Sequence, residues 1–175
     1  MTISELKSKI RNIPDFPKKG IQYKDITTLI SNSAAFLQAI DLMSQRYLTD
    51  GIDAVIGIEA RGFVVGAAMA HKLGTGVILV RKAGKLPCKT VSASYDLEYG
   101  KDCLEIHEDA IRPDMKVLVV DDVLATGGTV SATLNILKTM GADVLECCFL
   151  VELTALNGRA QLKEQKVFSL IQFDD

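Results

Sequence analysis

Two adjacent carboxylates, Asp121 and Asp122, directly follow the apolar run at residues 117–120. A short loop of small, glycine-rich and hydroxyl-bearing residues comes next, at 125–129. In open α/β sheets ligands bind outside the carboxyl ends of the strands, and free N–H groups at a helix N-terminus bind phosphate. Carboxylates beside such a phosphate site suit hydroxyl groups, a cation or both. The pattern therefore predicts a sugar phosphate as the ligand.

The loop after the aspartates has the composition of a phosphate cradle, because Gly127 and Gly128 let the backbone approach a ligand closely. It has neither the GxxxxGK nor the GxGxxG spacing, which excludes the two common nucleotide-binding loops. The alternatives are a plain tight turn before a helix and a pair of solvated carboxylates. Successive side chains of a strand point to opposite faces, so Asp121 and Asp122 can reach one ligand only if the chain leaves strand geometry there.

The elements that must position these residues alternate between strand and helix along most of the chain. We expect buried strands at 54–58, 77–80, 117–120, 144–153 and 167–173, and helices at 34–47, 62–73 and 130–140. This alternation predicts an α/β fold, a mostly parallel twisted sheet with helices on both faces, in a single domain over residues 1–175.

Two segments depart from the alternation. About the first 33 residues begin with a capping-box pattern at 2–5, contain two prolines, and are expected to form a small N-terminal cap. Residues 82–93 follow neither periodicity, which predicts a functional or mobile loop. Two antiparallel strands are expected after it, at 94–99 and 103–107, so that the loop and the strands form a flexible hairpin.

Composition narrows the class of protein. A chain of 175 residues with 48% hydrophobic residues is an ordinary globular domain, and its net charge of −2 gives no support for a nucleic-acid partner. No apolar run has the length of a membrane span, and the polar N-terminus predicts a cytoplasmic protein. Cys147 and Cys148 lie in an apolar run and are expected to be buried free thiols; no CxxC spacing indicates a zinc site.

Two further clusters could bind anions. Glu59-Ala60-Arg61-Gly62 lies between an expected strand and helix, where the arginine fork can hold two phosphate oxygens. Arg81, Lys82 and Lys85 place three cations within five positions at the start of the irregular segment. The alternatives are an arginine paired with nearby acids and a solvated basic loop.

The run Val119-Val120-Asp121-Asp122-Val123-Leu124-Ala125-Thr126-Gly127-Gly128-Thr129 resembles the phosphoribosyl-pyrophosphate (PRPP) signature of the type I phosphoribosyltransferases. Further matches to the adenine-using branch of that family span almost the whole chain: Pro14-Asp15-Phe16-Pro17, Tyr23-Lys24-Asp25-Ile26, Ala60-Arg61-Gly62-Phe63, Arg81-Lys82-Ala83-Gly84-Lys85-Leu86-Pro87, Ser94-Tyr95-Asp96-Leu97-Glu98-Tyr99-Gly100 and Val151-Glu152-Leu153.

The resemblance implies that adenine displaces pyrophosphate from PRPP, giving AMP. It implies four groups of binding residues: Ala125, Thr126, Gly127, Gly128 and Thr129 for the 5′-phosphate; Asp121 and Asp122 for the ribose; Glu59, Ala60, Arg61, Gly62, Arg81, Lys82 and Lys85 for pyrophosphate; and Gln22, Tyr23, Lys24 and Leu124 for adenine, under the N-terminal cap. Most relatives have Phe-Arg where this chain has Tyr23-Lys24, and Leu124 could equally belong to the core.

The resemblance also implies the catalytic groups and partners. Glu98 would act as general acid or base on the purine, with Arg61, Lys85 and Arg81 at the departing pyrophosphate. Mg²⁺ would be held mainly by PRPP and water, with Asp122 as a candidate ligand. A homodimer is implied in which Arg81 and Lys85 reach the neighbouring site. The alternatives are another purine base as acceptor and a non-catalytic regulator that senses PRPP.

Overall fold

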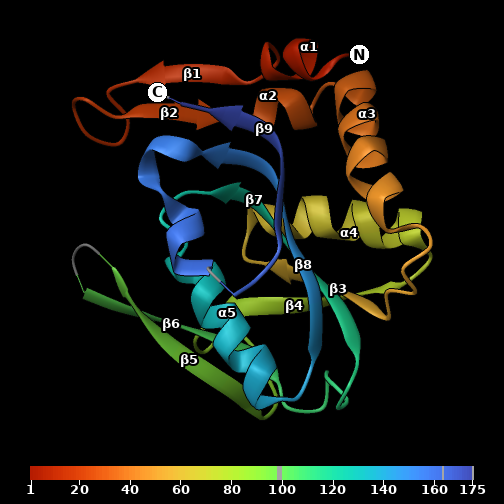
Figure 1. The fold of residues 1–175 in the computed structure, drawn as a ribbon. Coiled ribbons are helices and arrows are strands. Elements are labelled where there is room, and N and C mark those ends of the chain that lie inside the picture. The colour runs from red at the N-terminus through yellow and green to blue at the C-terminus, as the bar shows by residue number, and fades with distance from the viewer. Residues whose placement is uncertain (98–99, 163, 175) are drawn as a thin grey trace.

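The computed structural model describes residues 1–97, 100–162 and 164–174, and within these ranges a seven-stranded sheet forms the centre of the molecule (Figure 1). In chain order the elements are α1 (Ile3–Lys7), β1 (Arg11–Pro14), β2 (Gln22–Asp25), α2 (Thr27–Ile30), α3 (Ser33–Ser44), η1 (Gln45–Tyr47), β3 (Ala54–Ile58), α4 (Arg61–Leu73), β4 (Gly76–Lys82), β5 (Thr90–Leu97), β6 (Gly100–His107), β7 (Lys116–Leu124), α5 (Gly128–Thr139), β8 (Asp143–Leu153), η2 (Thr154–Leu156), η3 (Gly158–Leu162) and β9 (Val167–Phe173).

The strands of the central sheet lie in the order β5-β6-β4-β3-β7-β8-β9. β4, β3, β7, β8 and β9 run parallel, whereas β6 is antiparallel to both β4 and β5. The antiparallel β5–β6 hairpin extends from the body of the molecule at the lower left of Figure 1. The predicted α/β fold is confirmed, and the parallel order brings the carboxyl ends of β3, β7 and β8 to one edge.

Alternate residues of the parallel strands pack on opposite faces of the sheet. On β3, Val55 joins the core beneath α3 and α4, whereas Ala54, Ile56 and Ile58 join the core beneath α5. Burial on both faces explains why these strands read as continuous apolar runs in the sequence. The core also holds Cys147 and Cys148, which are free and buried as expected.

The irregular segment after β4 is shorter than the sequence predicts. β4 continues to Lys82 and β5 begins at Thr90, so the segment without a strand covers only 83–89. β5 pairs with β6 from Thr90↔His107 to Leu97↔Gly100, and this pairing supplies the strand structure that the local composition does not indicate. The expected burial of β4 is also wrong in part, because Val77 and Leu79 are 37% and 39% exposed.

The N-terminal segment has a two-stranded antiparallel sheet of its own, β1 and β2, and its Leu6 and Leu29 join the core beneath α3 and α4. The predicted capping box is present, with Thr2 and Glu5 bonded to each other's backbone N–H. The end of β9 fixes this unit to the main sheet: the ammonium groups of Lys7 and Lys24 lie 4.5 and 4.6 Å from the ring centre of Phe173. In the part of the chain that the structure describes, no helix combines the length and apolar character of a bilayer span.

Candidate functional site

A cavity of about 390 Å³ opens where β3 and β7 end and where β2 of the N-terminal unit faces them. Its lining consists of Ile21, Gln22, Tyr23, Lys24, Glu59, Ala60, Arg61, Asp121, Asp122, Val123, Ala125, Thr129 and Leu153. Three segments that lie far apart along the chain, at 21–24, 59–61 and 121–129, therefore meet in one space together with Leu153. This is the place where an open α/β sheet binds its ligand.

The remaining predicted residues lie around this cavity. Leu124, Thr126 and Gly127 line a smaller adjoining cavity of about 60 Å³, together with Asp121 and Thr129. Gly62 and Gly128 stand at the first turns of α4 and α5. Arg81, Lys82 and Lys85 lie outside the lining and are connected to it through Glu59, as described below. Glu98 lies outside the described residues.

The acidic pair does not require the chain to leave strand geometry, because β7 continues through both aspartates to Leu124. Both side chains are buried and both line the larger cavity. Asp121 also borders the smaller cavity, whereas Asp122 accepts a hydrogen bond from Nε of Arg61 at 2.5 Å. Strand alternation predicts that the two side chains point to opposite faces of β7, yet both residues line this cavity.

Asp121 has an unusual electrostatic environment. Burial raises its pKa well above the usual range, and the neighbouring Asp122 carboxylate adds to this rise. A hypothetical Cβ on Gly62 would come within 2.6 Å of Oδ1 of Asp121. Gly62 therefore lets the start of α4 lie directly against the acidic pair.

The phosphate-loop residues form the start of α5. Gly127 has φ +86° and is the N-cap residue, and its carbonyl accepts from the Ser131 N–H at 2.9 Å. A left-handed residue at this point turns the chain from β7 into the helix, and Thr129 and Val130 of the first turn of α5 line the smaller cavity. This is the geometry that binds an anion at a helix N-terminus.

Glu59 gathers the cations of the basic segment. Its Oε1 accepts from Nζ of Lys85 at 2.7 Å, and its Oε2 accepts from the Lys82 N–H at 2.8 Å and from Nε of Arg81 at 3.4 Å. Burial alone raises the pKa of Glu59, but these three hydrogen bonds outweigh it and the pKa lies below its usual value. Arg61, Arg81 and Lys85 are thus all paired with carboxylates of the site, and Lys82 pairs with Asp102.

The strand β2 presents one aromatic side chain to the cavity. The ring of Tyr23 lies edge-on to Phe16 with 5.1 Å between the ring centres, and Lys24 is buried beside Phe173. Leu124 is buried in the core beneath α5 and borders only the smaller cavity. It therefore has the place of a core residue, which the sequence left as an open alternative.

Three apolar lining residues, Ile21, Val123 and Leu153, were not identified from the sequence as site residues. Leu153 ends β8, which runs parallel to β7 with Leu124 opposite Glu152. The rule that neighbouring parallel strands end at one edge could have indicated it. Ile21 and Val123 flank predicted residues and carry no separate signal.

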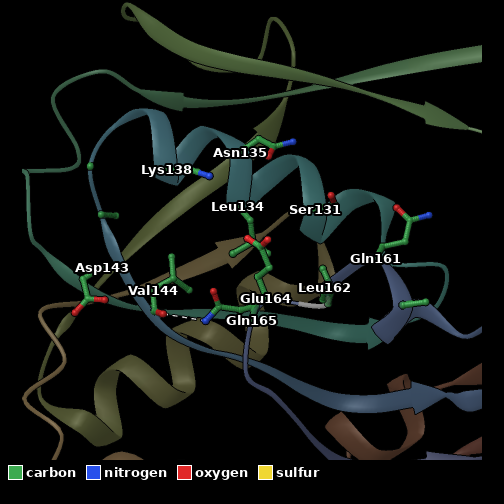
Figure 2. A pocket seen from close by; sticks show the side chains of 13 residues that line it. Ser131, Leu134, Asn135, Lys138, Asp143, Val144, Gln161, Leu162, Glu164 and Gln165 are labelled. Atoms are coloured by element: carbon green, nitrogen blue, oxygen red, sulfur yellow. Dashed lines mark hydrogen bonds between the residues drawn. The ribbon is translucent and has the colours of Figure 1, made fainter.

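A larger groove of about 730 Å³ lies elsewhere, between the outer side of α5 and the segment around η3 (Figure 2). Polar side chains such as Asn135, Lys138 and Glu164 lie around it, with Leu134 and Leu162 among its apolar lining. None of the residues that the sequence singled out for chemistry lines it. The chemistry-bearing residues gather instead at the cavity of about 390 Å³ beside the acidic pair.

The donor set is compatible with a magnesium ion that its substrate brings along. Among the residues that the structure describes, no group of three or more His, Cys, Asp and Glu side chains is arranged to hold a metal ion. Mg²⁺ usually keeps several waters and binds one or two carboxylates together with substrate phosphates. The acidic pair, which lies beside the N-terminus of α5, offers the one or two carboxylates of such a site.

Comparisons with known proteins agree with this arrangement. A family model described as "Phosphoribosyl transferase domain" matches residues 25–174. An adenine phosphoribosyltransferase from Geotalea daltonii is 57% identical over 171 residues, covering 98% of this chain and all of that protein.

Two solved structures show the same fold. The adenine phosphoribosyltransferase from Thermoanaerobacter pseudethanolicus superposes with a TM-score of 0.94 at 46% identity, over 98% of this chain and 100% of that one. The enzyme from Saccharomyces cerevisiae, in complex with an imino-altritol bisphosphate and adenine, gives a TM-score of 0.91 at 38% identity over 97% and 98%. The resemblance inferred from the motifs is confirmed, and the chain belongs to the phosphoribosyltransferase family, in its adenine phosphoribosyltransferase branch.

Proposed function

We propose that this protein transfers the 5-phosphoribosyl group from PRPP to adenine, forming AMP and pyrophosphate in purine salvage. One observation carries the proposal: a single cavity joins the β2 residues, the acidic pair and the phosphate loop, and Glu59 links it to the cations of Arg81 and Lys85. The relatives at 54–58% identity over the full length carry the name of this activity, and the yeast relative was solved with adenine bound.

The two ends of the cavity suit the two substrates. Adenine would lie by Tyr23, whose ring can stack on a purine, with the backbone of Gln22 and Lys24 at the edge of the base. The 5′-phosphate would lie at the start of α5, and the ribose hydroxyls at Asp121 and Asp122. Adenine N9 then attacks the ribose carbon as its bond to pyrophosphate breaks.

Catalysis would come mainly from groups that meet charge in the transition state. Negative charge grows on the departing pyrophosphate, and Arg61, Arg81 and Lys85 would receive it; all three are now paired with carboxylates at or beside the cavity. Each of them must exchange its present carboxylate partner for phosphate oxygens. Asp121 and Asp122 would stabilise the electron-poor ribose. Glu98 would handle the proton of the purine ring, a role that rests on the family resemblance.

We further propose Mg²⁺ as the cofactor. Bound with PRPP, the ion would neutralise the pyrophosphate oxygens, which is the chemistry it supplies in phosphoryl and pyrophosphoryl sites. The carboxylate of Asp122 is the candidate protein ligand, and Asp121 lies next to it. A cytoplasmic location suits the four free cysteines, because thiols stay reduced there.

A homodimer is the proposed assembly. Val77 and Leu79 share one face of β4 and are both exposed, although they belong to a strand of the central sheet. The same strand carries Arg81, so an interface over β4 would bring the basic segment close to the partner's site. The exposed apolar side chains support such an interface.

The activity is tested with purified protein, PRPP, Mg²⁺ and a panel of adenine, hypoxanthine, guanine, xanthine and orotate. We expect AMP as product and a preference for adenine of roughly tenfold or more, because base recognition by a built pocket discriminates at least to that extent. If another base of the panel is used better than adenine, that base is the substrate and the assignment of adenine is wrong. PRPP binding without turnover of any base would instead support the regulator alternative.

A further inference from the structure

The residues directly after β8 lie against the back of the phosphate loop. Asn157 has φ +51° and turns the chain into η3, which begins at Gly158. The position of a Cβ on Gly158 is already occupied by the carbonyl oxygen of Ala125, and Cδ1 of Leu124 lies 3.0 Å away. The position of a Cβ on Gly127 lies 2.5 Å from the carbonyl oxygen of Gly158. Two backbones therefore touch where neither residue has a side chain.

An ion pair fixes this second backbone. The Arg159 guanidinium donates from Nε to Oε1 of Glu152 and from Nη2 to Oε2 of Glu152, both at 2.7 Å, and from Nη1 to the carbonyl of Val167 at 3.0 Å. Glu152 is the penultimate residue of β8, opposite Leu124 of β7, and its side chain is 5% exposed. A two-point fork to a buried carboxylate fixes both position and orientation.

We propose that Gly158 and Arg159 are positioning residues for the 5′-phosphate: they hold the Ala125–Gly127 backbone in the conformation that receives it. This inference rests on the proposed function. Neither residue lines the cavity of 390 Å³ or the cavity of 60 Å³. They act through the loop, and the loop reaches the ligand through the first turn of α5.

The decisive variant is Gly158→Ala, with Gly76→Ala as its matched control. Neither glycine has a φ in the left-handed region, so the backbone angle of neither position strains an alanine. At Gly76 a Cβ meets nothing within 4 Å, whereas at Gly158 it meets backbone atoms of the loop. Arg159→Lys and Arg159→Gln form a second pair that leaves the glycine contact intact, and lysine lacks the two-point fork.

The readout is binding by calorimetry of two probes that separate the ends of the site, ribose 5-phosphate and pyrophosphate, together with the KM values for PRPP and adenine and the Tm. We expect Gly158→Ala to weaken ribose 5-phosphate binding roughly tenfold or more, because the added Cβ must displace the Ala125 carbonyl and a lost hydrogen bond to a charged group costs roughly tenfold or more in binding. Pyrophosphate binding by Gly158→Ala should stay within about twofold of the wild type. The two binding constants and the two KM values of Gly76→Ala should stay within the same limit. Arg159→Gln should likewise weaken the binding of ribose 5-phosphate and leave that of pyrophosphate unchanged. Arg159→Lys should show the same loss, because lysine lacks the two-point fork.

Equal losses for both probes would overturn the inference, because they indicate a general structural role. Unchanged ribose 5-phosphate binding in folded Gly158→Ala would also overturn it; if that variant does not fold, Arg159→Gln decides in the same way. Wild-type protein that binds ribose 5-phosphate but forms no AMP would overturn the proposed function and leave this inference standing. Wild-type protein that does not bind ribose 5-phosphate would overturn both.

Discussion

At the scale of single residues, Asp121 is a buried carboxyl whose charge costs stability. Its folded-state pKa is raised, first by burial and then by Asp122, above the unfolded value of about 4. A carboxyl whose pKa is higher in the folded than in the unfolded state destabilises the fold only at pH values at which the unfolded chain ionises it. The cost is therefore absent below about pH 4 and grows as the pH rises toward the folded pKa.

We expect Asp121→Asn to increase the free energy of unfolding at pH 7 by on the order of 1 kcal/mol and to reduce turnover with PRPP. Urea unfolding between pH 4 and pH 8 measures the first effect, which should shrink toward zero at the acid end. Asp109→Asn, at an exposed turn position, is the control. A gain of equal size at every pH would contradict the assignment to the buried charge.

Glu59 forms ion pairs with Arg81 and Lys85, two cations that pyrophosphate would need. Glu59→Gln keeps an acceptor for the Lys82 N–H but removes the charge that competes for Lys85 and Arg81. We expect pyrophosphate to bind several-fold more tightly, in the way that removing a competing partner strengthens a charge-assisted contact. Product inhibition by pyrophosphate measures this.

The control for Glu59→Gln is Asp41→Asn, which breaks an exposed ion pair with Lys72 outside the cavity. Weaker pyrophosphate binding in Glu59→Gln would show that the carboxylate aligns the cations instead of competing for them. In that case Glu59 would belong to the pyrophosphate-binding residues.

At the scale of elements, one carboxylate shapes the segment at 83–89. Glu105 of β6 is buried; its Oε1 accepts from the Gly84 N–H at 2.7 Å and the Lys85 N–H at 3.2 Å, and its Oε2 accepts from Thr90 Oγ1 at 3.1 Å. We expect Glu105→Ala to raise KM for PRPP roughly tenfold and to speed amide exchange at Gly84 and Lys85, because a backbone turn loses its acceptor.

Glu105→Gln should restore most of the wild-type behaviour, since an amide oxygen accepts the same two N–H groups. Glu108→Gln, at an exposed position near Lys89, is the surface control. Equal damage from alanine and glutamine would mean that the negative charge, and not the acceptor, supports the turn.

Sequence patterns predicted the parallel strands well, because β3, β7 and β8 are buried on both faces and read as apolar runs. They predicted β5 poorly, because its strand structure comes from pairing with β6. Most of the site could be predicted for the same reason: its residues follow strand ends. The Glu59–Lys85 pair, 26 residues apart, and the contact of Gly158 with Ala125 could not, because ion pairs and backbone contacts between distant segments leave no local pattern.

At the scale of the whole molecule, the exposed face of β4 determines the assembly that we propose. Leu79→Glu places a charge on that face and should convert dimer to monomer in sedimentation experiments, with a loss of activity that deepens on dilution. Leu37→Glu, on α3 and 65% exposed, introduces the same charge elsewhere and should change neither. A wild type that sediments as a monomer at all concentrations would contradict the proposed assembly.

The carboxylate partners of Arg61, Arg81 and Lys85 also affect how a substrate arrives. Positively charged clefts draw anions in from solution, and their association rates fall steeply as ionic strength rises. Here the cations are neutralised before PRPP reaches them, and the chain as a whole carries a net charge of −2. The field outside the cavity therefore offers a polyanion little attraction. PRPP should therefore bind at an association rate that depends only weakly on salt concentration. The preference for its charge should appear in a slow dissociation rate.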